Sequence, residues 1–423
     1  VLDADQKQFL AGVGDSIQRA FYPSVALDTF AAGKILYEKV YAGTDSFYRY
    51  STDPDLAKYS LSFIEVGAGR GNYVPEFNGA NGKVYRYVPP AGTQLQGSYE
   101  PVTILVTPKK QQLVNLGVDY AITEQTLLKT EVAMSNYDPN TFSKINNGDD
   151  KGFAAKFQLN NSRQLRERNN LQLLTGVDYE YVDRKFKPLE RLRTVEFSRD
   201  WGLPLVIDQQ TENIIRGMVG LKDNRNQGIL YKFTNYRRGD DYSGNQHALN
   251  HNMDLKGWVF NNELVITQFS AFRDRGIFFR PTLDVSKQFK KLNNHKLGFR
   301  YAEEQNSVRE KSSDTLTPTA FSFDSYSVYL QSDDQKKNRY GITFFTRADR
   351  YAYGKSFIRG DRSYNLNLQT ELLANPKRQF YFNATFRKLD IINSVVSQQE
   401  ADETILGRAE YVMNELKGLI TGN

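Results

Sequence analysis

Apolar and polar residues alternate along most of the chain beyond residue 110. Successive side chains of an extended strand point to opposite sides, so a period of two predicts strands with one apolar and one polar face. The pattern is clearest in five segments: Leu128–Ser135, Phe153–Asn160, Phe279–Ser286, Tyr340–Asp349 and Tyr364–Leu372.

Strand length separates a membrane protein from a soluble one. About sixteen segments of roughly 10–14 residues lie between Gln111 and Glu415. A tilted strand needs about 9–11 residues to cross a bilayer, whereas soluble strands most often have about 5–6. We therefore expect an all-β fold, a transmembrane antiparallel β-barrel of about 16 strands over residues 108–423. Only its outer face must be apolar, which agrees with a mean hydropathy of −0.59 alongside 13% aromatic residues.

The lengths of the connections and the positions of the aromatic residues also favour an outer-membrane barrel. Outer-membrane barrels have short turns at one rim, longer loops at the other and aromatic girdles at both, although aromatic residues also favour strands in general. Short links are expected at Asp223–Gln227, Asn261–Asn262, Leu292–Asn294, Asp333–Lys337 and Asn375–Lys377. The link expected at Arg275–Ile277 is an exception, because it is short where the alternation calls for a long one. Long loops are expected at Gly239–Gln246, Val308–Ala320, Tyr351–Arg362 and Asn393–Glu403.

Residues 1–107 are expected to form a small β-rich module with a short leading helix. Asp3 is placed to cap a helix with Leu10, Val13 and Ile17 on its apolar side. Turn residues separate the short strand-like runs that follow. These runs are Lys34–Tyr41, Phe47–Tyr50, Tyr59–Val66 and Lys83–Val88.

The composition and the spacing of residues indicate no catalytic, cofactor-binding or metal-binding site. The chain has no Cys, which excludes thiolate metal sites and thiol catalysis. Gly67–Asn72 lacks the third glycine and the following helix of a dinucleotide loop, and Asn78–Gly82 has too few carboxylates for calcium. His247 and His251 lack the glutamate of a zinc helix. The acidic pairs Asp149–Asp150 and Asp240–Asp241 are expected to be solvated loop charges. We therefore assign no catalytic, cofactor-binding or metal-binding residue.

Six basic residues occupy the polar faces of separate predicted strands. In a barrel these faces line the lumen, where the six could form an anion path or simply solvate the wall. The net charge of +6 is small and interleaved with acidic residues, so no nucleic-acid partner is expected. The six are Lys156, Arg216, Lys232, Arg300, Arg347 and Arg387.

Several short stretches carry a resemblance to a known family. Gly67–Tyr73 with Asn78–Gly82, Val84–Pro89, Arg193–Trp201 and Leu406–Tyr411 resemble segments of large, poorly characterised outer-membrane barrel proteins of Bacteroidota-type bacteria. The resemblance implies an outer-membrane location and a surface or transport-related role, with no catalytic residues to transfer.

The end of the chain departs from that pattern. Bacterial barrels generally finish on a strand with an aromatic terminal residue, whereas this chain ends Leu419–Asn423, and Lys417–Ile420 resembles the start of a new strand. We expect the chain to be part of a longer polypeptide.

Two functional classes remain. The first is a pore, conduit or structural component of a cell-envelope transport or secretion assembly, with outer-membrane lipid and other envelope proteins as partners. The second is a soluble extracellular β-rich protein that binds glycan or a protein partner. A lipid-modifying barrel enzyme is disfavoured because no nucleophile constellation is recognisable.

Overall fold

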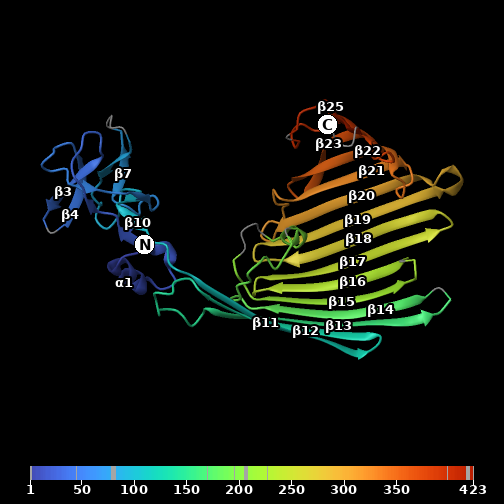
Figure 1. The fold of residues 1–423 in the computed structure, drawn as a ribbon, viewed down its shortest axis with the longest axis horizontal. Coiled ribbons are helices and arrows are strands. Elements are labelled where there is room, and N and C mark those ends of the chain that lie inside the picture. The colour runs from blue at the N-terminus through green and yellow to red at the C-terminus, as the bar shows by residue number, and fades with distance from the viewer. Residues whose placement is uncertain are drawn as a thin grey trace. The chain divides into compact units, whose positions relative to one another are not determined.

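The structure is a computed structural model, and it describes residues 2–43, 45–77, 82–168, 170–194, 196–203, 208–225, 227–397, 399–415 and 420–422. The chain divides into two compact units (Figure 1). The first comprises residues 1–113 and 135–151, and the second comprises residues 114–134 and 152–423. Residues 135–151 thus belong to the first unit although they lie beyond residue 107, where we expected the N-terminal module to end.

The first unit begins with helix α1, Ala4–Val13. The Asp3 side chain accepts a hydrogen bond from the Gln6 amide at 2.7 Å, and the Gln6 side chain accepts one from the Asp3 amide at 3.1 Å. This capping box satisfies helix donors that have no partner in the first turn. The helix ends at Gly14, whose φ of 65° breaks the helical geometry. Ile17 therefore falls outside α1, in the 3₁₀ turn η1, Ile17–Arg19.

Short antiparallel strands form the rest of this unit. A ring contact network organises them, in which Phe63 packs against Tyr37, Tyr73 and Tyr85 at centroid distances of 5.4, 5.0 and 4.4 Å. The three sheets are β1 (Phe21–Pro23) with β10 (Val102–Ile104); β2 (Ala26–Leu27), β5 (Tyr59–Ser60), β3 (Leu36–Ala42) and β4 (Asp45–Ser51); and β6 (Ile64–Glu65), β9 (Tyr99–Glu100), β7 (Tyr73–Glu76) and β8 (Val84–Tyr87).

One antiparallel sheet dominates the second unit, and it runs in sequence order from β11 to β26. Figure 1 shows that this sheet is curved. β11 stands at one end of the strand order, and β25 stands near the other end. The strands are β11 (Lys110–Thr123), β12 (Thr126–Asp138), β13 (Lys151–Arg166), β14 (Leu171–Val182), β15 (Glu212–Lys222), β16 (Gly228–Arg238), β17 (Tyr242–Leu255), β18 (Trp258–Ser270), β19 (Asp274–Phe289), β20 (His295–Glu310), β21 (Phe321–Gln331), β22 (Asn338–Tyr353), β23 (Ser356–Leu372), β24 (Arg378–Ile391), β25 (Asp402–Glu415) and β26 (Ile420–Gly422).

The all-β, antiparallel expectation is confirmed, whereas a closed ring is not seen. Among the described residues β11 and β26 are the two edges of the sheet. The sheet has 16 strands, but the last, β26, contains only three residues. Most of the expected run Lys417–Ile420 lies outside the described residues. No helix in the described parts of the chain is long and apolar enough to span a bilayer.

The links between strands sort by length between the two rims. Those that follow β12, β14, β20 and β24 are the long ones, and all four lie at one end of the strands, which we call the loop rim. Opposite them, short links join the strands at the turn rim, as at Asp223–Gln227, Leu292–Asn294, Asp333–Lys337 and Asn375–Lys377. The four long links are residues 139–150, 183–211, 311–320 and 392–401.

Several individual link assignments are wrong. The expected loop Gly239–Gln246 is mostly strand, because β17 begins at Tyr242. The expected loop Tyr351–Arg362 is a tight turn at residues 354–355 between β22 and β23. Asn261–Asn262 and Arg275–Ile277 lie inside β18 and β19, and the true turn before β18 is at residues 256–257. The alternation of the sequence therefore locates faces better than it locates turns.

Candidate functional site

The register of the sheet places all six basic residues on one face, which we call the inner face. Residues paired directly across antiparallel strands share a face. Lys156 pairs with Glu180, Arg216 with Thr234 and Arg300 with Ser327. On β16 Lys232 shares the face of Thr234, and the ladder continues to Arg347 opposite Ser363 and Arg387 opposite Asn365.

Ion pairing divides the six into two groups. Arg216 binds Asp178 at 2.5 Å and also Glu180 at 3.5 Å, and Arg347 binds Asp349 at 2.6 Å. The other four form no ion pair with any residue that the structure describes. Those four are Lys156, Lys232, Arg300 and Arg387. They are spread over β13, β16, β20 and β24 rather than gathered at one point.

The opposite, outer face is apolar and mostly exposed along the middle of the strands. A row of directly paired residues crosses it from β20 to β25: Phe299, Val328, Phe344, Leu366, Phe386 and Ile405. The adjacent inner-face row is mostly polar: Arg300, Ser327, Phe345, Asn365, Arg387 and Thr404. On β23 the polar Asn365 is only 5% exposed, whereas Leu368 is 36% and Leu372 is 42% exposed. This distribution is the reverse of that in a water-soluble β-sheet protein.

An aromatic girdle requires side chains on the outer face, and only some of the aromatic residues near strand ends lie there. Tyr179 and Phe279 lie on the outer face, as the pairing of Tyr179 with Ile215 and of Phe279 with Ile266 requires. Phe278 and Tyr351 instead share the inner face. Phe278 is buried, and the Tyr351 hydroxyl donates to the Asp361 carboxylate at 2.7 Å. The aromatic residues at segment ends thus serve both faces.

A segment of the chain folds back against the inner face near the loop rim. It comprises the described residues of 183–211, which are all of them except 195 and 204–207, and we call it the inner segment. It contains the short helix α2, Phe197–Asp200, followed by Trp201. This segment links β14 to β15 and was not recognised in the sequence as a structural element.

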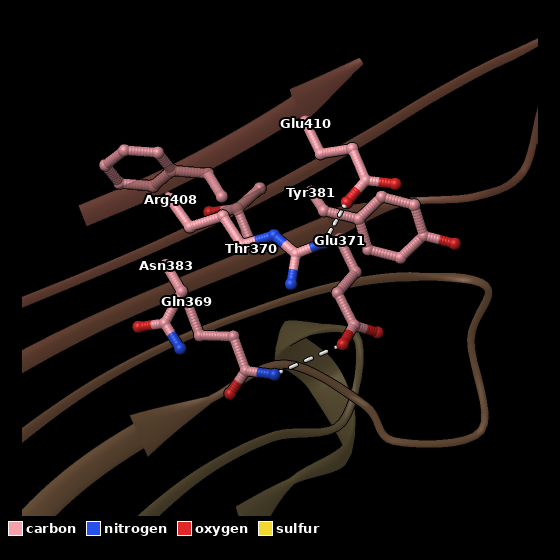
Figure 2. A pocket seen from close by; sticks show the side chains of 8 residues that line it. Gln369, Thr370, Glu371, Tyr381, Asn383, Arg408 and Glu410 are labelled. Carbon is pink, nitrogen blue, oxygen red and sulfur yellow. Dashed lines mark hydrogen bonds and ion pairs between the residues drawn. The ribbon is translucent and has the colours of Figure 1, made fainter. Parts of the chain in front are cut away.

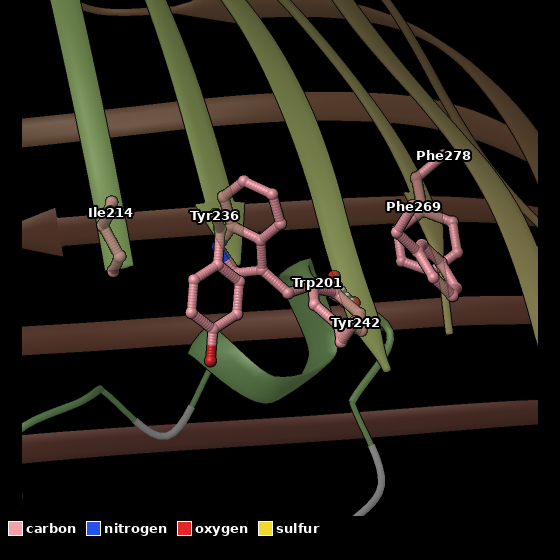
Figure 3. Packing of buried hydrophobic residues seen from close by; sticks show 6 residues of the cluster. All are labelled: Trp201, Ile214, Tyr236, Tyr242, Phe269 and Phe278. Carbon is pink, nitrogen blue, oxygen red and sulfur yellow. Dashed lines mark hydrogen bonds between the residues drawn. The ribbon is translucent and has the colours of Figure 1, made fainter. Parts of the chain in front are cut away.

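An aromatic cluster anchors the inner segment (Figure 3). Trp201 is 4% exposed, and its ring lies 5.2 Å from that of Tyr236. The Tyr242 hydroxyl donates a hydrogen bond to the Trp201 carbonyl at 2.5 Å. Gly202 has a φ of 61°, and a Cβ there would lie 2.5 Å from the Phe269 ring, so glycine is required at this turn. The remaining members of the cluster are Ile214 and Phe278.

Two arginines add electrostatic anchors. Arg193 pairs with Glu180 and binds Glu212 at 2.6 Å, which ties the segment to the ends of β14 and β15. Arg280 on β19 binds Asp200 at 2.8 Å and Glu304 at 3.2 Å. These partly buried, charge-assisted bonds hold a fixed geometry better than exposed pairs do. The inner segment is therefore fastened to β14, β15 and β19.

Two hollows adjoin these elements. A cavity of about 470 Å³ lies within the inner segment, lined in part by Arg184, Arg191, Gln209 and Gln210. A second pocket of about 330 Å³ lies between β23, β24 and β25 at the turn rim (Figure 2). Its polar lining includes Gln369, Glu371, Tyr381, Asn383, Arg408 and Glu410, with Arg408 bound to Glu410 at 2.5 Å. Both hollows present hydrogen-bonding groups suited to polar solutes.

The histidines belong to the sheet. His247 and His251 lie on β17, where a spacing of four residues is extended rather than one helical turn. His247 Nδ1 contacts the Tyr231 hydroxyl at 2.7 Å, and His251 Nδ1 contacts the Asn262 amide at 3.2 Å. Each therefore has a separate neighbour on an adjacent strand.

The glycine-rich stretch Gly67–Asn72 serves a close backbone approach. A Cβ at Gly71 would lie 2.5 Å from the Tyr99 carbonyl oxygen, because Gly71 forms a bridge with Gly97 beside β9. The turn Asn78–Gly82 lies outside the described residues except for Gly82.

The two acidic pairs have different environments. Asp240 and Asp241 lie exposed in the turn between β16 and β17, as expected. Asp149 is exposed as well, whereas Asp150 is buried, so the expectation of a solvated loop charge is wrong for Asp150 alone. Asp149 and Asp150 pack near Asp15, which is far from them in the sequence. No local pattern could have indicated that proximity.

Comparison with known proteins gives remote structural likenesses. No family model and no curated protein sequence matches the chain. The structure of the alcaligin outer-membrane receptor FauA from Bordetella pertussis is similar with a TM-score of 0.37 and 9% identity, over 74% of this chain and 58% of that one. The chain thus spans less than two thirds of that protein. OccK9 (OpdG) of Pseudomonas aeruginosa gives a TM-score of 0.33 and 10% identity, over 71% and 90% of the two chains.

Proposed function

We propose that this chain forms an outer-membrane β-barrel that conducts polar solutes, with the inner segment narrowing its lumen. The carrying observation is the contrast between two adjacent rows across β20–β25, apolar and exposed outside, mostly polar inside. An exposed apolar row of this length is costly in water and is satisfied by lipid. The resemblance to Bacteroidota-type barrel proteins agrees with this location.

The strands have the dimensions that this role needs. A strand needs roughly 9–11 residues to cross the hydrocarbon core. β15, with 11 residues, equals the upper end of this range, and β23, with 17 residues, exceeds it. The longest strands extend beyond the bilayer, which accounts for outer-face charges such as Arg350 and Asp324 near the loop rim, bound to each other. Outer-membrane lipid is the partner that the outer face requires, and other envelope proteins are candidates at the two sheet edges.

The lumen would favour anions. Lys156, Lys232, Arg300 and Arg387 face it without an ion pair among the described residues, whereas many inner acids, such as Asp178 and Glu212, are bound by arginines. Basic walls raise the local concentration of anions. The cavity of the inner segment adds guanidinium and amide donors on the same path.

Site-specific labelling tests the orientation of the sheet. The chain contains no Cys, so a single engineered thiol is unique. Val328→Cys places an environment-sensitive fluorophore on the outer face, and Ser327→Cys, the matched control, places it on the inner face. In liposomes of brominated lipid we expect quenching at position 328 and not at 327. Equal quenching at both positions would contradict the proposal.

Behaviour without detergent tests the competing class. A membrane barrel should aggregate when detergent is removed and insert into liposomes. A protein that stays monodisperse in plain buffer would instead support the soluble β-rich binding protein, with the pocket of Figure 2 as its first candidate glycan or peptide site.

A further inference from the structure

The outer face changes in character between the middle of the strands and the loop rim. The apolar row from β20 to β25 lies in the middle, and the next row toward the loop rim is rich in tyrosine. Tyr301 and Tyr326 pair across β20 and β21, and their rings lie 5.1 Å apart. In a membrane barrel such rings lie at the level of the lipid headgroups. The paired residues of this second row are Tyr301, Tyr326, Thr346, Tyr364, Lys388 and Glu403.

Just beyond the tyrosines, a β-bulge on β23 places two arginines on the outer face. Arg362 pairs with Ala348 and Arg359 pairs with Arg350, while Gly360 between them is the extra residue at the register shift. Two residues three positions apart point to opposite faces of a regular strand, and the bulge instead turns both arginines to one face. A Cβ at Gly360 would lie 2.4 Å from an aromatic ring of β22, so the bulge requires glycine.

Neither of these two guanidinium groups has a partner in the part of the chain that the structure describes. No ion pair or side-chain hydrogen bond is formed by Arg359 or by Arg362. Arg359 is exposed, whereas Arg362 is half-buried and its Nε is buried without a hydrogen-bond acceptor. A buried charged donor without an acceptor is destabilising unless a ligand supplies the acceptor.

The acidic residues on the outer face of β21, β24 and β25 near the loop rim are engaged elsewhere. Asp324 is bound by Arg350. Asp390 pairs in register with the half-buried arginine, but its carboxylate lies 3.9 Å from Lys388 Nζ. The same Nζ lies 3.5 Å from the Glu403 carboxylate. The two arginines of the bulge therefore keep their positive charge uncompensated.

The spacing and charge of the two arginines suit a phosphate group. Neighbouring positions on one face of a strand are about 6–7 Å apart, so both long side chains can reach one ligand between them. A guanidinium donates two parallel hydrogen bonds to phosphate oxygens. A phosphomonoester carries a charge of about −1.5 to −2 at pH 7, which matches two guanidinium groups better than the single charge of a phosphodiester does.

We propose that Arg359 and Arg362 bind a phosphomonoester on the headgroup of a glycolipid in the outer leaflet. The proposal rests on the proposed function, because it requires the apolar row to lie in a bilayer. Long loops mark the extracellular rim of an outer-membrane barrel, so the lipid at this height belongs to the outer leaflet. In a bacterial outer membrane that leaflet contains phosphorylated glycolipid. Lys388 and Arg350 lie on either side and add to the attraction of an anionic headgroup.

Native mass spectrometry of the full chain in detergent, titrated with diphosphoryl lipid A, tests the site. We expect saturable binding of one molecule, and Arg359→Gln and Arg362→Gln should each weaken it about tenfold. The double variant with Arg359→Lys and Arg362→Lys keeps both charges but loses the two-pronged geometry, so it should also bind more weakly. The matched control is Arg237→Gln, which removes an exposed arginine from the outer face of β16 and should bind like the wild type.

Two further measurements identify the ligand. Phosphatidylglycerol, a phosphodiester, should bind at least about tenfold more weakly than lipid A, and equal binding would overturn the assignment to a phosphomonoester. Protein extracted in mild detergent from a bacterial outer membrane should retain a lipid with the mass of a phosphorylated glycolipid. Retention of a phospholipid in its place would overturn the assigned source.

Insertion into liposomes separates this site from the proposed function. Because neither arginine has a described side-chain partner, the Gln variants should fold, insert and conduct ions like the wild type. If all the proteins insert and bind lipid A equally well, the lipid site is overturned and the barrel is not. A wild-type protein that never inserts would overturn both.

Discussion

Arg280 on β19 and Asp200 at the end of α2 form an ion pair at 2.8 Å, although 80 residues of chain separate them. Together with the aromatic cluster around Trp201, this pair holds the inner segment against the inner face. The segment contributes Trp201 to a buried aromatic cluster, so under the proposed function its release should change what passes through the lumen.

Trp201→Ala should free the inner segment and raise single-channel conductance in planar bilayers. Truncation of a buried aromatic residue costs about 3–5 kcal/mol, so the released population should rise by a factor of about 100 or more. Trypsin should then cleave at Arg184 and Arg191 faster than in the wild type. Trp258→Ala is the matched control, because Trp258 lies on the outer face at the turn rim. Equal conductance of the Trp201 variant and the wild type would exclude a narrowing role.

Lys232→Glu and Arg300→Glu should each shift ion selectivity toward cations. The interaction of two unit charges at about 4 Å in water is roughly 1 kcal/mol, which corresponds to about a fivefold change in preference. The reversal potential across a salt gradient measures this change. Arg237→Glu, on the outer face of β16, should leave the reversal potential unaltered. A shift as large for Arg237 as for Lys232 would argue against the assigned faces.

Val328→Arg should destabilise the protein in liposomes by about 2–4 kcal/mol if residue 328 faces the middle of the bilayer. Ser327→Arg should change stability much less, because it adds a charge to a polar lumen. Urea unfolding in liposomes, followed by intrinsic fluorescence, compares the two variants. Equal losses would indicate that both faces meet the same environment.

The first unit should become less stable as the pH rises through the weakly acidic range. Burial raises the pKa of Glu100 above 4.5, although hydrogen bonds from Asn72 oppose the shift. The folded state thus binds this proton more tightly than the unfolded chain does. Its contribution to stability is present below the ordinary pKa of 4.5 and is lost as the pH passes through the raised value.

Glu100→Gln should remove that dependence, since its side-chain oxygen still accepts the two bonds from Asn72 without a charge. Hydrogen exchange of β7 and β9, compared between the two proteins at each pH, measures the difference. The variant should be better protected than the wild type above the raised pKa and similar to it at lower pH. Parallel pH profiles would show that another group is responsible.

The sequence predicts faces because alternation is a local property. The faces of Leu368 and Asn365 can be predicted from the alternation of their immediate neighbours, and the strand register of the structure agrees with that prediction. Turns were harder to place at the loop rim, where the strands extend past the apolar row. There Arg350, Asp361 and Arg362 are polar on both faces, so alternation disappears although the strands continue to the turn at residues 354–355.

The sites depend on contacts that local patterns do not encode. Trp201 becomes a core residue only because β15–β19 bring Tyr236, Phe269 and Phe278 around it. The cluster of Asp15 and Asp150 forms only because the link after β12 folds back onto α1. A signal was nevertheless present, because a lone tryptophan and Gly202 stand together within a long polar link.

In the part of the chain that the structure describes, β11 and β26 are the two edges of the large sheet, and this has a consequence for the size of the proposed passage. The backbone groups along β11 and β26 need hydrogen-bond partners in hydrocarbon, so in a bilayer these edges must be joined, directly or through added strands. The circumference of a β-barrel grows with each strand. The strands that join the two edges would therefore determine the internal diameter of the barrel, and with it the largest molecule that can enter.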